Sequence, residues 1–233
     1  VPHTDEFSWT EMGRPWAAYS WLFEVLIYFL YSQLGLIGIM VYAYLLLLAI
    51  TASLHSLIRK FEPRLAQSVG LTALALIAMT RIWGPRPWLF SILFFCLELN
   101  VLVRVRQSRN YRILWLLVPL FALWANFHIQ FVYGFLVLGL ASIEEPLLTQ
   151  WGRWFSSENG DEVPLPSRKM LLITVACGFA LMANPYHVRI YAVLFNTLQL
   201  HGFYELISEL QPLPFRGFPD WLVLFLTLGA AFA

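Results

Sequence analysis

Long apolar runs separated by short polar links dominate the pattern of this chain. The runs are residues 36–57, 66–83, 87–103, 111–125, 127–143, 170–183 and 220–233. A helix that crosses a bilayer upright needs about 20 apolar residues, and several runs are shorter. Broken helices that are covered by protein tolerate such lengths, and Gly84-Pro85-Arg86-Pro87, Pro119 and Asn184-Pro185 supply the breaks. We therefore predict an all-α, polytopic helical membrane protein with about seven spans, whose transmembrane domain covers residues 36–233.

Residues 17–34 carry a different pattern. Polar side chains recur there at helical spacing and form one stripe; they are Ser20, Glu24, Tyr28, Tyr31 and Ser32. A helix with one polar stripe favours a position in the membrane interface over a crossing of the bilayer. We predict an interfacial amphipathic helix over 17–34, which Gly35 separates from the first span.

The composition supports a membrane protein. Of the residues, 59% are hydrophobic and 12% are charged, whereas a soluble domain has about 25% charged residues. The net charge of +1 and the lack of a basic patch interleaved with aromatics give no indication of nucleic-acid binding. Cys96 and Cys177 lie in apolar runs and have no metal-ligand spacing. The chain starts without Met and stops within an apolar run, so we expect a fragment of a longer chain.

The distribution of Lys and Arg predicts an orientation, because cytoplasmic loops of membrane proteins are enriched in these residues. With 17–34 flat and residues 1–16 forming the first extracytoplasmic loop, ten basic residues face the cytoplasm and five face outward. The ten are Arg59, Lys60, Arg64, Arg104, Arg106, Arg109, Arg112, Arg153, Arg168 and Lys169, and the five are Arg14, Arg81, Arg86, Arg189 and Arg216. The longest hydrophilic stretch, residues 144–169, then becomes a flexible cytoplasmic loop.

This orientation places most of the candidate chemistry on the outer side. The polar residues there are Asp5, Glu6, Arg81, Arg86, Asn126, His128, Asn184, His187, Arg189, Glu205 and Glu209, and His3 and His201 join them. Carboxylates, imidazoles and guanidinium groups at one mouth suit an acid–base or phosphate-handling site. The alternative is that polar residues gather at any membrane interface, where water solvates them.

Each candidate has a functional and a structural interpretation. Asp5 and Glu6 suit a general base or a metal ligand, although adjacent carboxylates also occur in solvated turns. Arg81 and Arg86 flank a Gly-Pro turn and suit phosphate binding by paired hydrogen bonds. Their alternative is to reach toward lipid headgroups.

Asn126 and His128, like Asn184 and His187, follow apolar runs and are candidate pocket residues. The asparagines alternatively cap helix ends. A divalent-metal site of His128, His187 and Asp5 is conceivable from the ligand types, but no HExxH spacing supports it. We therefore leave the cofactor unknown.

Glu98 stands apart, because it is the one carboxylate within a predicted span. An ionisable residue inside a membrane helix is a functional candidate by default. Its place near the inner end of the span alternatively allows partial solvation.

Several short stretches resemble a known family. They are Gly13-Arg14-Pro15-Trp16 after an acidic residue, Arg86-Pro87-Trp88-Leu89-Phe90, Leu123-Trp124-Ala125-Asn126-Phe127-His128 and Ala183-Asn184-Pro185-Tyr186. Their order resembles bacterial membrane proteins of the GT-C glycosyltransferase type, relatives of the protein mannosyltransferases and aminoarabinose transferases. Tyr19-Ser20 stand where related sequences often carry a His, which is a departure from the pattern.

The resemblance implies inverting transfer of a sugar from a polyprenyl-phosphate donor to a lipid, glycan or protein acceptor. The reaction would take place at the extracytoplasmic face of the bacterial inner membrane. Asp5, with Glu6 beside it, matches the acidic residue that orients or deprotonates the acceptor, and Arg81 and Arg86 would bind the phosphate. The alternatives are a transporter or channel, for which broken helices are also typical, and an accessory membrane subunit without catalysis.

Overall fold

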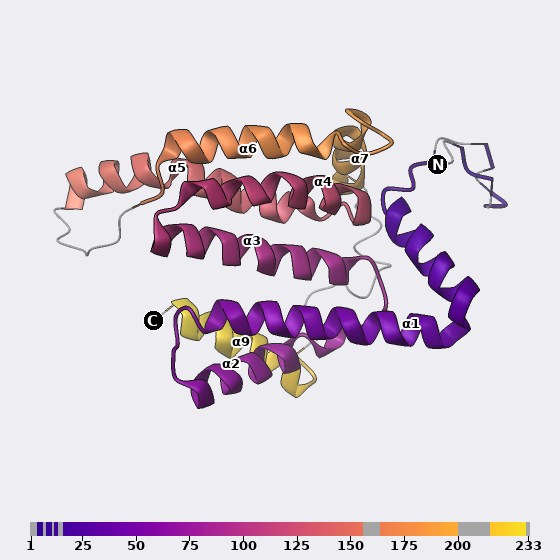
Figure 1. Cartoon of the computed structure of the whole chain (residues 1–233), viewed down its shortest axis with the longest axis horizontal. Helices are drawn as coiled ribbons and strands as arrows, with labels where there is room; N and C mark the ends of the chain where they lie inside the picture. Colours follow the sequence, from indigo (N-terminus) through magenta and orange to yellow (C-terminus); the bar gives the residue numbers. More distant parts are fainter. Residues whose placement is uncertain are drawn as a thin grey trace.

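The computed structural model describes residues 4–6, 8–10, 12–13, 16–155, 164–199 and 215–231. Within these residues every regular element longer than one residue is a helix, which confirms the all-α class (Figure 1). The elements are α1 (Trp21–Ile58), α2 (Leu65–Ala78), η1 (Thr80–Ile82), α3 (Trp88–Ser108), η2 (Tyr111–Leu116), α4 (Leu117–Phe127), α5 (Phe131–Phe155), α6 (Ser167–Leu181), α7 (Arg189–Gln199) and α9 (Phe218–Ala231).

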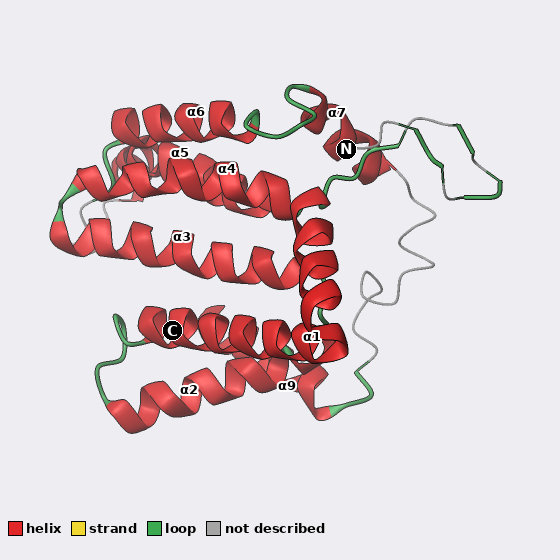
Figure 2. Cartoon of the chain, turned by 45° about the vertical axis from the view of Figure 1, so that its right-hand side comes forward, coloured by secondary structure: helices red, strands yellow, loops and turns green. Residues whose placement is uncertain are grey.

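The long helices run back and forth between two ends of one bundle (Figures 1 and 2). We call one of them the basic end; residues 58–65, 108–112 and 164–169 form it, at the left of Figure 1. We call the opposite end the latched end; residues 16–20, 79–88, 127–131 and 182–189 form it. The two groups of basic loops that the Lys and Arg count separated thus lie at opposite ends of the bundle, and which end faces the cytoplasm stays a prediction.

Gly35 divides α1 into two parts. Its φ of 60° and ψ of −146° lie in a region that glycine alone occupies readily. The second part of α1 runs along the bundle, whereas the first part turns and crosses the ends of α3 and α4 (Figure 2). The predicted boundary at Gly35 is confirmed.

The first part of α1 follows the predicted polar stripe only in part, because Ser20 is buried and apolar Phe29 is exposed. Phe23 and Leu26 pack on the buried core, and Glu24 and Tyr28 on the other side are exposed. The helix begins at Trp21 and not at residue 17, because Ser20 adopts a non-helical conformation (φ −107°, ψ 28°) as its N-cap. The predicted start was therefore wrong by four residues.

The predicted loop over 144–169 was also too long. Helix α5 continues through Pro146 to Phe155, and α6 already starts at Ser167. Proline inside a helix removes one backbone hydrogen bond, and the good helix formers around it in Glu144-Glu145-Pro146-Leu147-Leu148 support the continuation.

Three helices are long and apolar enough to cross a membrane: Trp21–Ile58, Trp88–Ser108 and Phe131–Gln150. Three shorter apolar helices accompany them, at Leu65–Ala78, Tyr111–Phe127 and Phe218–Ala230. Length and composition thus support a membrane protein, and the total of about seven spans stays a prediction.

The core lies where α3, α4, α5 and α6 meet. Phe121, Trp124, Phe131 and Leu138 are almost completely buried there. The outer surface is apolar as well; for example, Met40 and Tyr44 on α1 are 70% and 62% exposed. Apolar side chains on both the inside and the outside suit helices that face lipid.

Candidate functional site

Arg86 stands in the link between η1 and α3, and two tryptophans hold this link. Trp83 Nε1 donates a hydrogen bond to the Leu76 carbonyl at 3.2 Å, and Trp88 Nε1 donates one to the Ile82 carbonyl at 2.8 Å. The Arg86 guanidinium carbon lies 4.9 Å from the centre of the Trp88 ring, a cation–π distance. Arg86 is exposed. An exposed guanidinium on a fixed link can present paired donors to a phosphate.

Arg81, the second predicted phosphate ligand, lies in η1 of the same connection. Its backbone is described and its side chain lies outside the described part of the chain. The Arg81 backbone therefore lies in the same connection as Arg86, at the same end of the bundle.

Asn126 joins the start of α1 to the links after α4 and α6. Its Oδ1 accepts a hydrogen bond from Trp21 Nε1 at 2.7 Å. Its Nδ2 donates to the carbonyls of Ala122 and Ala183, each at 2.7 Å. The side chain is buried. Both amide donors are therefore used, and Asn126 is a structural residue in this arrangement.

Asn184 makes a parallel set of contacts. Its Nδ2 donates to the Ala125 carbonyl at 2.7 Å, and its Oδ1 accepts from the Tyr186 backbone N–H at 2.9 Å. The Tyr186 hydroxyl in turn accepts from the Ala18 N–H at 2.7 Å. We call Trp21, Asn126, Asn184 and Tyr186 together the asparagine latch. The latch fixes three chain segments that lie more than 50 residues apart in sequence.

His128 follows directly after α4 and is buried in the same region. Trp124 Nε1 donates to Ser91 Oγ at 2.9 Å, and Ser91 Oγ lies 3.0 Å from His128 Nδ1. The Ser91 hydroxyl already accepts a hydrogen bond from the indole, so its own proton is left to donate to His128 Nδ1. A ring whose Nδ1 accepts is the neutral imidazole with its proton on Nε2.

Burial lowers the pKa of His128 from 6.5 to about 4, and a hydrogen bond with the Gln130 side chain opposes this only in part. The imidazole is therefore neutral near pH 7. Neutral imidazole can accept a proton or bind a metal, but the ring is only 8% exposed. We assign it a structural role in the latched end.

His187, in contrast, is exposed. Its φ of 46° places it in the left-handed region, where the turn after Asn184 ends. Its Nδ1 lies 3.2 Å from the Met182 carbonyl. Of the two predicted pocket histidines, only His187 is accessible to a ligand in solution.

Asp5 is buried, and its carboxylate organises the first segment. Oδ1 accepts from the Ser8 N–H at 2.8 Å, and Oδ2 accepts from the Ser8 hydroxyl. The Asp5 carbonyl also accepts from the Gly13 N–H at 2.7 Å. Glu6 beside it is exposed. A carboxylate held by two donors is fixed in direction, which suits orienting a partner hydroxyl.

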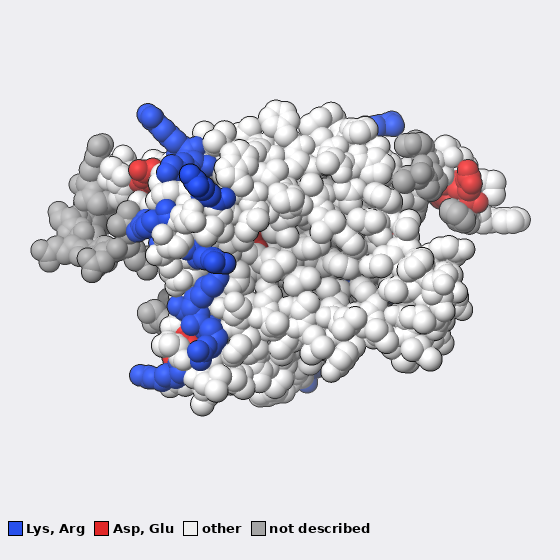
Figure 3. Space-filling model, viewed as in Figure 1, with Lys and Arg blue, Asp and Glu red and all other residues white. Residues whose placement is uncertain are grey.

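The basic end has a very different surface. Nine described Lys and Arg side chains lie there, and they form a band at the left of Figure 3: Arg59, Lys60, Arg64, Arg104, Arg106, Arg109, Arg112, Arg168 and Lys169. Three described carboxylates accompany them: Glu62, Glu144 and Glu145. Arg106 binds both oxygens of Glu144, at 2.7 and 2.6 Å, which ties α3 to α5.

Lys60 at this end is half-buried and held by hydrogen bonds. Its Nζ donates to the backbone carbonyl and to Oδ1 of Asn100, both at 2.7 Å, and Asn100 Nδ2 donates to the Ser53 carbonyl at 2.8 Å. Burial and the neighbouring Arg104 lower the pKa of Lys60. Sequence reasoning missed Asn100, whose signal was a lone amide in the apolar run 87–103.

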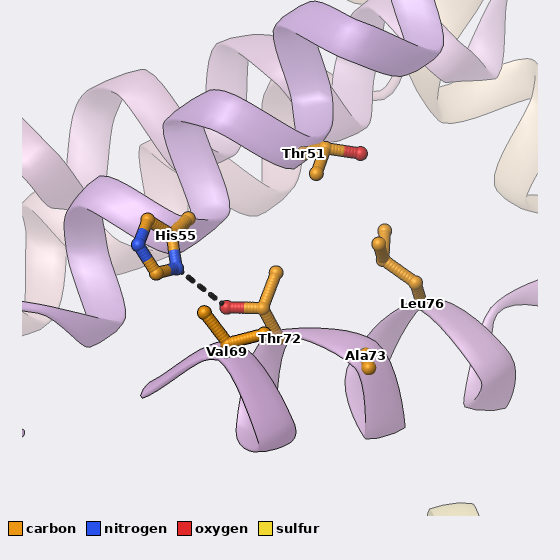
Figure 4. Close-up of a pocket in the computed structure, with 6 residues that line it drawn as sticks. All are labelled: Thr51, His55, Val69, Thr72, Ala73 and Leu76. Atoms are coloured by element: carbon orange, nitrogen blue, oxygen red, sulfur yellow. Dashed lines mark hydrogen bonds between the residues drawn. The ribbon is translucent and has the colours of Figure 1, made fainter. Parts of the chain in front are cut away.

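A groove of about 290 Å³ lies between the second part of α1 and α2 (Figure 4). Thr51, His55, Val69, Thr72, Ala73 and Leu76 line it. His55 Nδ1 lies 3.0 Å from the Thr72 hydroxyl, which itself donates to the Ser68 carbonyl at 2.7 Å. His55 Nδ1 is therefore the donor, and no predicted site residue lines this groove.

The remaining candidates do not form a metal centre. Within the described residues no group of three His, Cys, Asp or Glu side chains is placed to hold a metal ion. The predicted outer residues His3, Arg14, His201, Glu205 and Glu209 lie outside the described residues. The structure thus brings Asn126, His128 and Asn184 together, and places Arg86 and His187 in links of the same end.

Comparison of the chain with protein-family models, with curated proteins and with solved structures gives no match. The function is therefore argued from the residues of the latched end.

Proposed function

We propose that the chain is part of a GT-C-like membrane glycosyltransferase. In this proposal the latched end faces the extracytoplasmic side of the bacterial inner membrane. It takes a sugar from a polyprenyl-phosphate donor and transfers it to a lipid, glycan or protein acceptor, with inversion at the anomeric carbon.

The observation that carries the proposal is the exposure and fixed position of the Arg86 side chain. Its guanidinium is exposed, stacked on Trp88 and fixed by a link with two indole hydrogen bonds. The basic end carries nine described Lys and Arg side chains, whereas the described part of the latched end carries two, Arg86 and Arg189. An oriented, exposed guanidinium suits one phosphate group of a membrane-bound donor.

The proposed roles combine the accessibility of each side chain with the family resemblance. Arg86, with Arg81 in the same link, would neutralise the phosphate as it departs. Asp5, which is buried against Ser8, takes the role that the resemblance implies: it would orient the acceptor hydroxyl and take its proton once the acceptor reaches it. Glu6 beside it is the exposed carboxylate of this segment. The exposed His187 would contact the sugar or the acceptor. Asn126, His128 and Asn184 hold the links in place and do not touch substrate.

The chemical step balances without a further reactant. The acceptor oxygen forms a bond to the anomeric carbon, and the bond from that carbon to the phosphate oxygen breaks. The electron pair stays on the polyprenyl phosphate, and the acceptor proton passes to the carboxylate. A positioned general base contributes about 10² to 10⁴ in rate.

The first experiment measures binding, since the sugar is unidentified. Polyprenyl phosphate without a sugar is added to the protein in nanodiscs, and the wild type is compared with Arg86→Ala and Arg86→Lys. We expect the loss of affinity to be large for Arg86→Ala and smaller for Arg86→Lys, which keeps the charge but not the paired donors. Equal binding by all three proteins would contradict the proposed phosphate site.

The second experiment measures transfer from a panel of polyprenyl-phosphate sugars. Asp5→Asn should lower the rate by about 10² to 10⁴. Ser8→Ala is the matched control, because it removes a hydrogen bond to the same carboxylate and leaves the carboxylate in place. Asp5→Asn and Ser8→Ala variants of equal activity would contradict a catalytic role for Asp5.

A further inference from the structure

Glu98 lies near the middle of α3, far from both ends of the bundle. It is 0% exposed, and neither carboxylate oxygen has a hydrogen-bond partner. An isolated ionised carboxylate in apolar surroundings costs far more free energy than the neutral acid. Buried carboxylates normally have partners, so this one is unusual.

Two other buried carboxylates of the described chain show the usual situation. Asp5 accepts hydrogen bonds from Ser8, and Asp220 accepts them from the backbone N–H groups of Arg216 and Gly217. Both carboxylates organise a loop at a helix or segment start. Glu98 has no such local task.

The neighbouring helix leaves space for the Glu98 carboxyl group. Gly134 of α5 faces it, and a Cβ at that position would collide with Glu98 Oε2. The same Cβ would lie 2.8 Å from a Trp124 ring atom and 2.9 Å from a Phe121 ring atom. The carboxyl group is therefore enclosed by α4 and α5 and fits only beside a glycine.

Within the described residues, no Lys, Arg or His side chain hydrogen-bonds to the Glu98 carboxyl group. The space at Gly134 of α5 is bounded by this carboxyl group and by the rings of Trp124 and Phe121 from α4. From α6 the Cys177 thiol is close enough to interact with the Glu98 charge. These groups offer no positive charge that would stabilise a carboxylate.

We propose that Glu98 is a proton-binding site inside the helix bundle. The carboxyl group holds a proton while α3 and α5 are packed against each other at Gly134. It can release that proton only when the two helices separate enough to admit water or a cation. This site is independent of sugar transfer at the latched end, because it shares no residue with it.

A hydrophobic carbodiimide tests the site directly, since it reacts with a protonated carboxyl group in apolar surroundings. The carboxyl oxygen bonds to the central carbon of the reagent, and the carboxyl proton moves to a reagent nitrogen. The O-acylisourea then rearranges to an N-acylurea, so the whole reagent mass is added and nothing leaves. Peptide mass spectrometry of the wild type in nanodiscs should find this added mass on Glu98.

Glu145 provides the matched comparison within the same chain, because it is exposed at the basic end. A charged, water-soluble carbodiimide should label Glu145 and spare Glu98, and the hydrophobic reagent should label Glu98 in preference. The Glu98→Gln variant should lose the added mass at that peptide. Labelling of Glu98 should also fall as the pH is raised. Failure of the hydrophobic reagent at Glu98, or equal labelling by both reagents, would overturn the proposal.

A pair of substitutions tests the contact with Gly134. Gly134→Ala should lower the unfolding temperature of the wild type, because the new methyl group occupies the space of the carboxyl group. The same change should cost less in a Glu98→Ala background, where the closest of the three contacts is removed and only the Trp124 and Phe121 rings crowd the methyl group. Identical shifts in both backgrounds would show that Gly134 does not enclose the Glu98 site and would overturn that part of the proposal.

Discussion

The two ends of the bundle solve different problems with polar side chains. At the latched end, Asn126 and Asn184 are buried and join distant segments by hydrogen bonds. At the basic end, most charged groups are exposed and point away from the core, and an ion pair such as Arg106–Glu144 is a local exception. Buried amides thus fix the structure at one end, and exposed charged groups form the surface of the other.

The comparison indicates which end of the bundle tolerates substitutions. A buried amide that loses its partners leaves several backbone groups unsatisfied, so the latched end tolerates few changes. Replacing an exposed cation changes the free energy of unfolding only a little. The tests below compare matched substitutions at the two ends.

The largest effect is expected for the asparagine latch. Asn126→Ala leaves the Trp21 indole and two carbonyls without their partner, and we expect a loss of about 2–4 kcal/mol in the free energy of unfolding. Asn110→Ala at the basic end removes an exposed cap of η2 and should cost about 1 kcal/mol or less. Unfolding of both variants in the same detergent measures the difference, and equal losses would contradict the contrast between the ends.

The next effect is a pH dependence that His128 confers on the latched end. Its pKa is about 4 in the folded protein and near 6.5 when unfolded. Between these values the unfolded state binds more protons, so stability falls as the pH is lowered from about 6.5 to about 4, by up to about 3 kcal/mol. Below pH 4 both states are protonated and this loss stops growing.

The His128→Gln variant is the control for this pH profile. It cannot gain a proton, so the difference between its stability and that of the wild type should change across the same pH range. A constant difference at every pH would show that His128 does not titrate differently in the two states.

A smaller effect is expected at Gly35, whose conformation lets the first part of α1 reach the latched end. Gly35→Ala meets no steric obstacle, and the cost of about 1–3 kcal/mol comes from the backbone conformation alone. Gly70→Ala in α2 also meets no obstacle, and in a regular helix it should stabilise by about 0.4–1 kcal/mol. Thermal unfolding of the two variants should therefore shift in opposite directions, and a common sign would contradict the proposed role of Gly35.

The smallest effect concerns the surface charge. Arg112→Gln at the basic end should weaken retention of anionic lipid by about 1 kcal/mol, or roughly fivefold. Arg189→Gln at the latched end should leave retention nearly unchanged, because the described part of this end carries fewer Lys and Arg side chains than the basic end. Native mass spectrometry of lipid bound to each variant measures this, and equal losses would remove the distinction between the two surfaces.

The sequence predicted the fold class and several boundaries correctly for physical reasons. Glycine at 35 and the Gly-Pro and Asn-Pro links end helices locally, so periodicity and turn chemistry suffice to find them. Pro119 was predicted as a break, but it lies in the first turn of α4, where its missing N–H costs nothing. The helical continuation through Pro146 escaped prediction because local proline signals do not reveal what supports the helix around them.

The site was harder to predict than the fold. Asn126 and Asn184 were found as candidates from their position after apolar runs, but their partners, Ala183 and Ala125, are 57 and 59 residues away. A single sequence does not contain such pairings. The hydrogen bonds give both asparagines a structural task, which was one of the two predicted roles, and the pocket role stays a prediction. The unpartnered state of Glu98 likewise depends on three other helices and could not be read from α3.

Orientation of the two ends is the central claim, and one measurement tests it most directly. The native Cys96 and Cys177 are buried, so Arg112→Cys and Arg189→Cys each add one accessible thiol at one end of the bundle. A membrane-impermeant maleimide applied to intact cells should label the Arg189→Cys variant, and it should label Arg112→Cys only after the membrane is permeabilised. Labelling of Arg112→Cys in intact cells, with Arg189→Cys protected, would contradict an extracytoplasmic latched end and the proposed site with it.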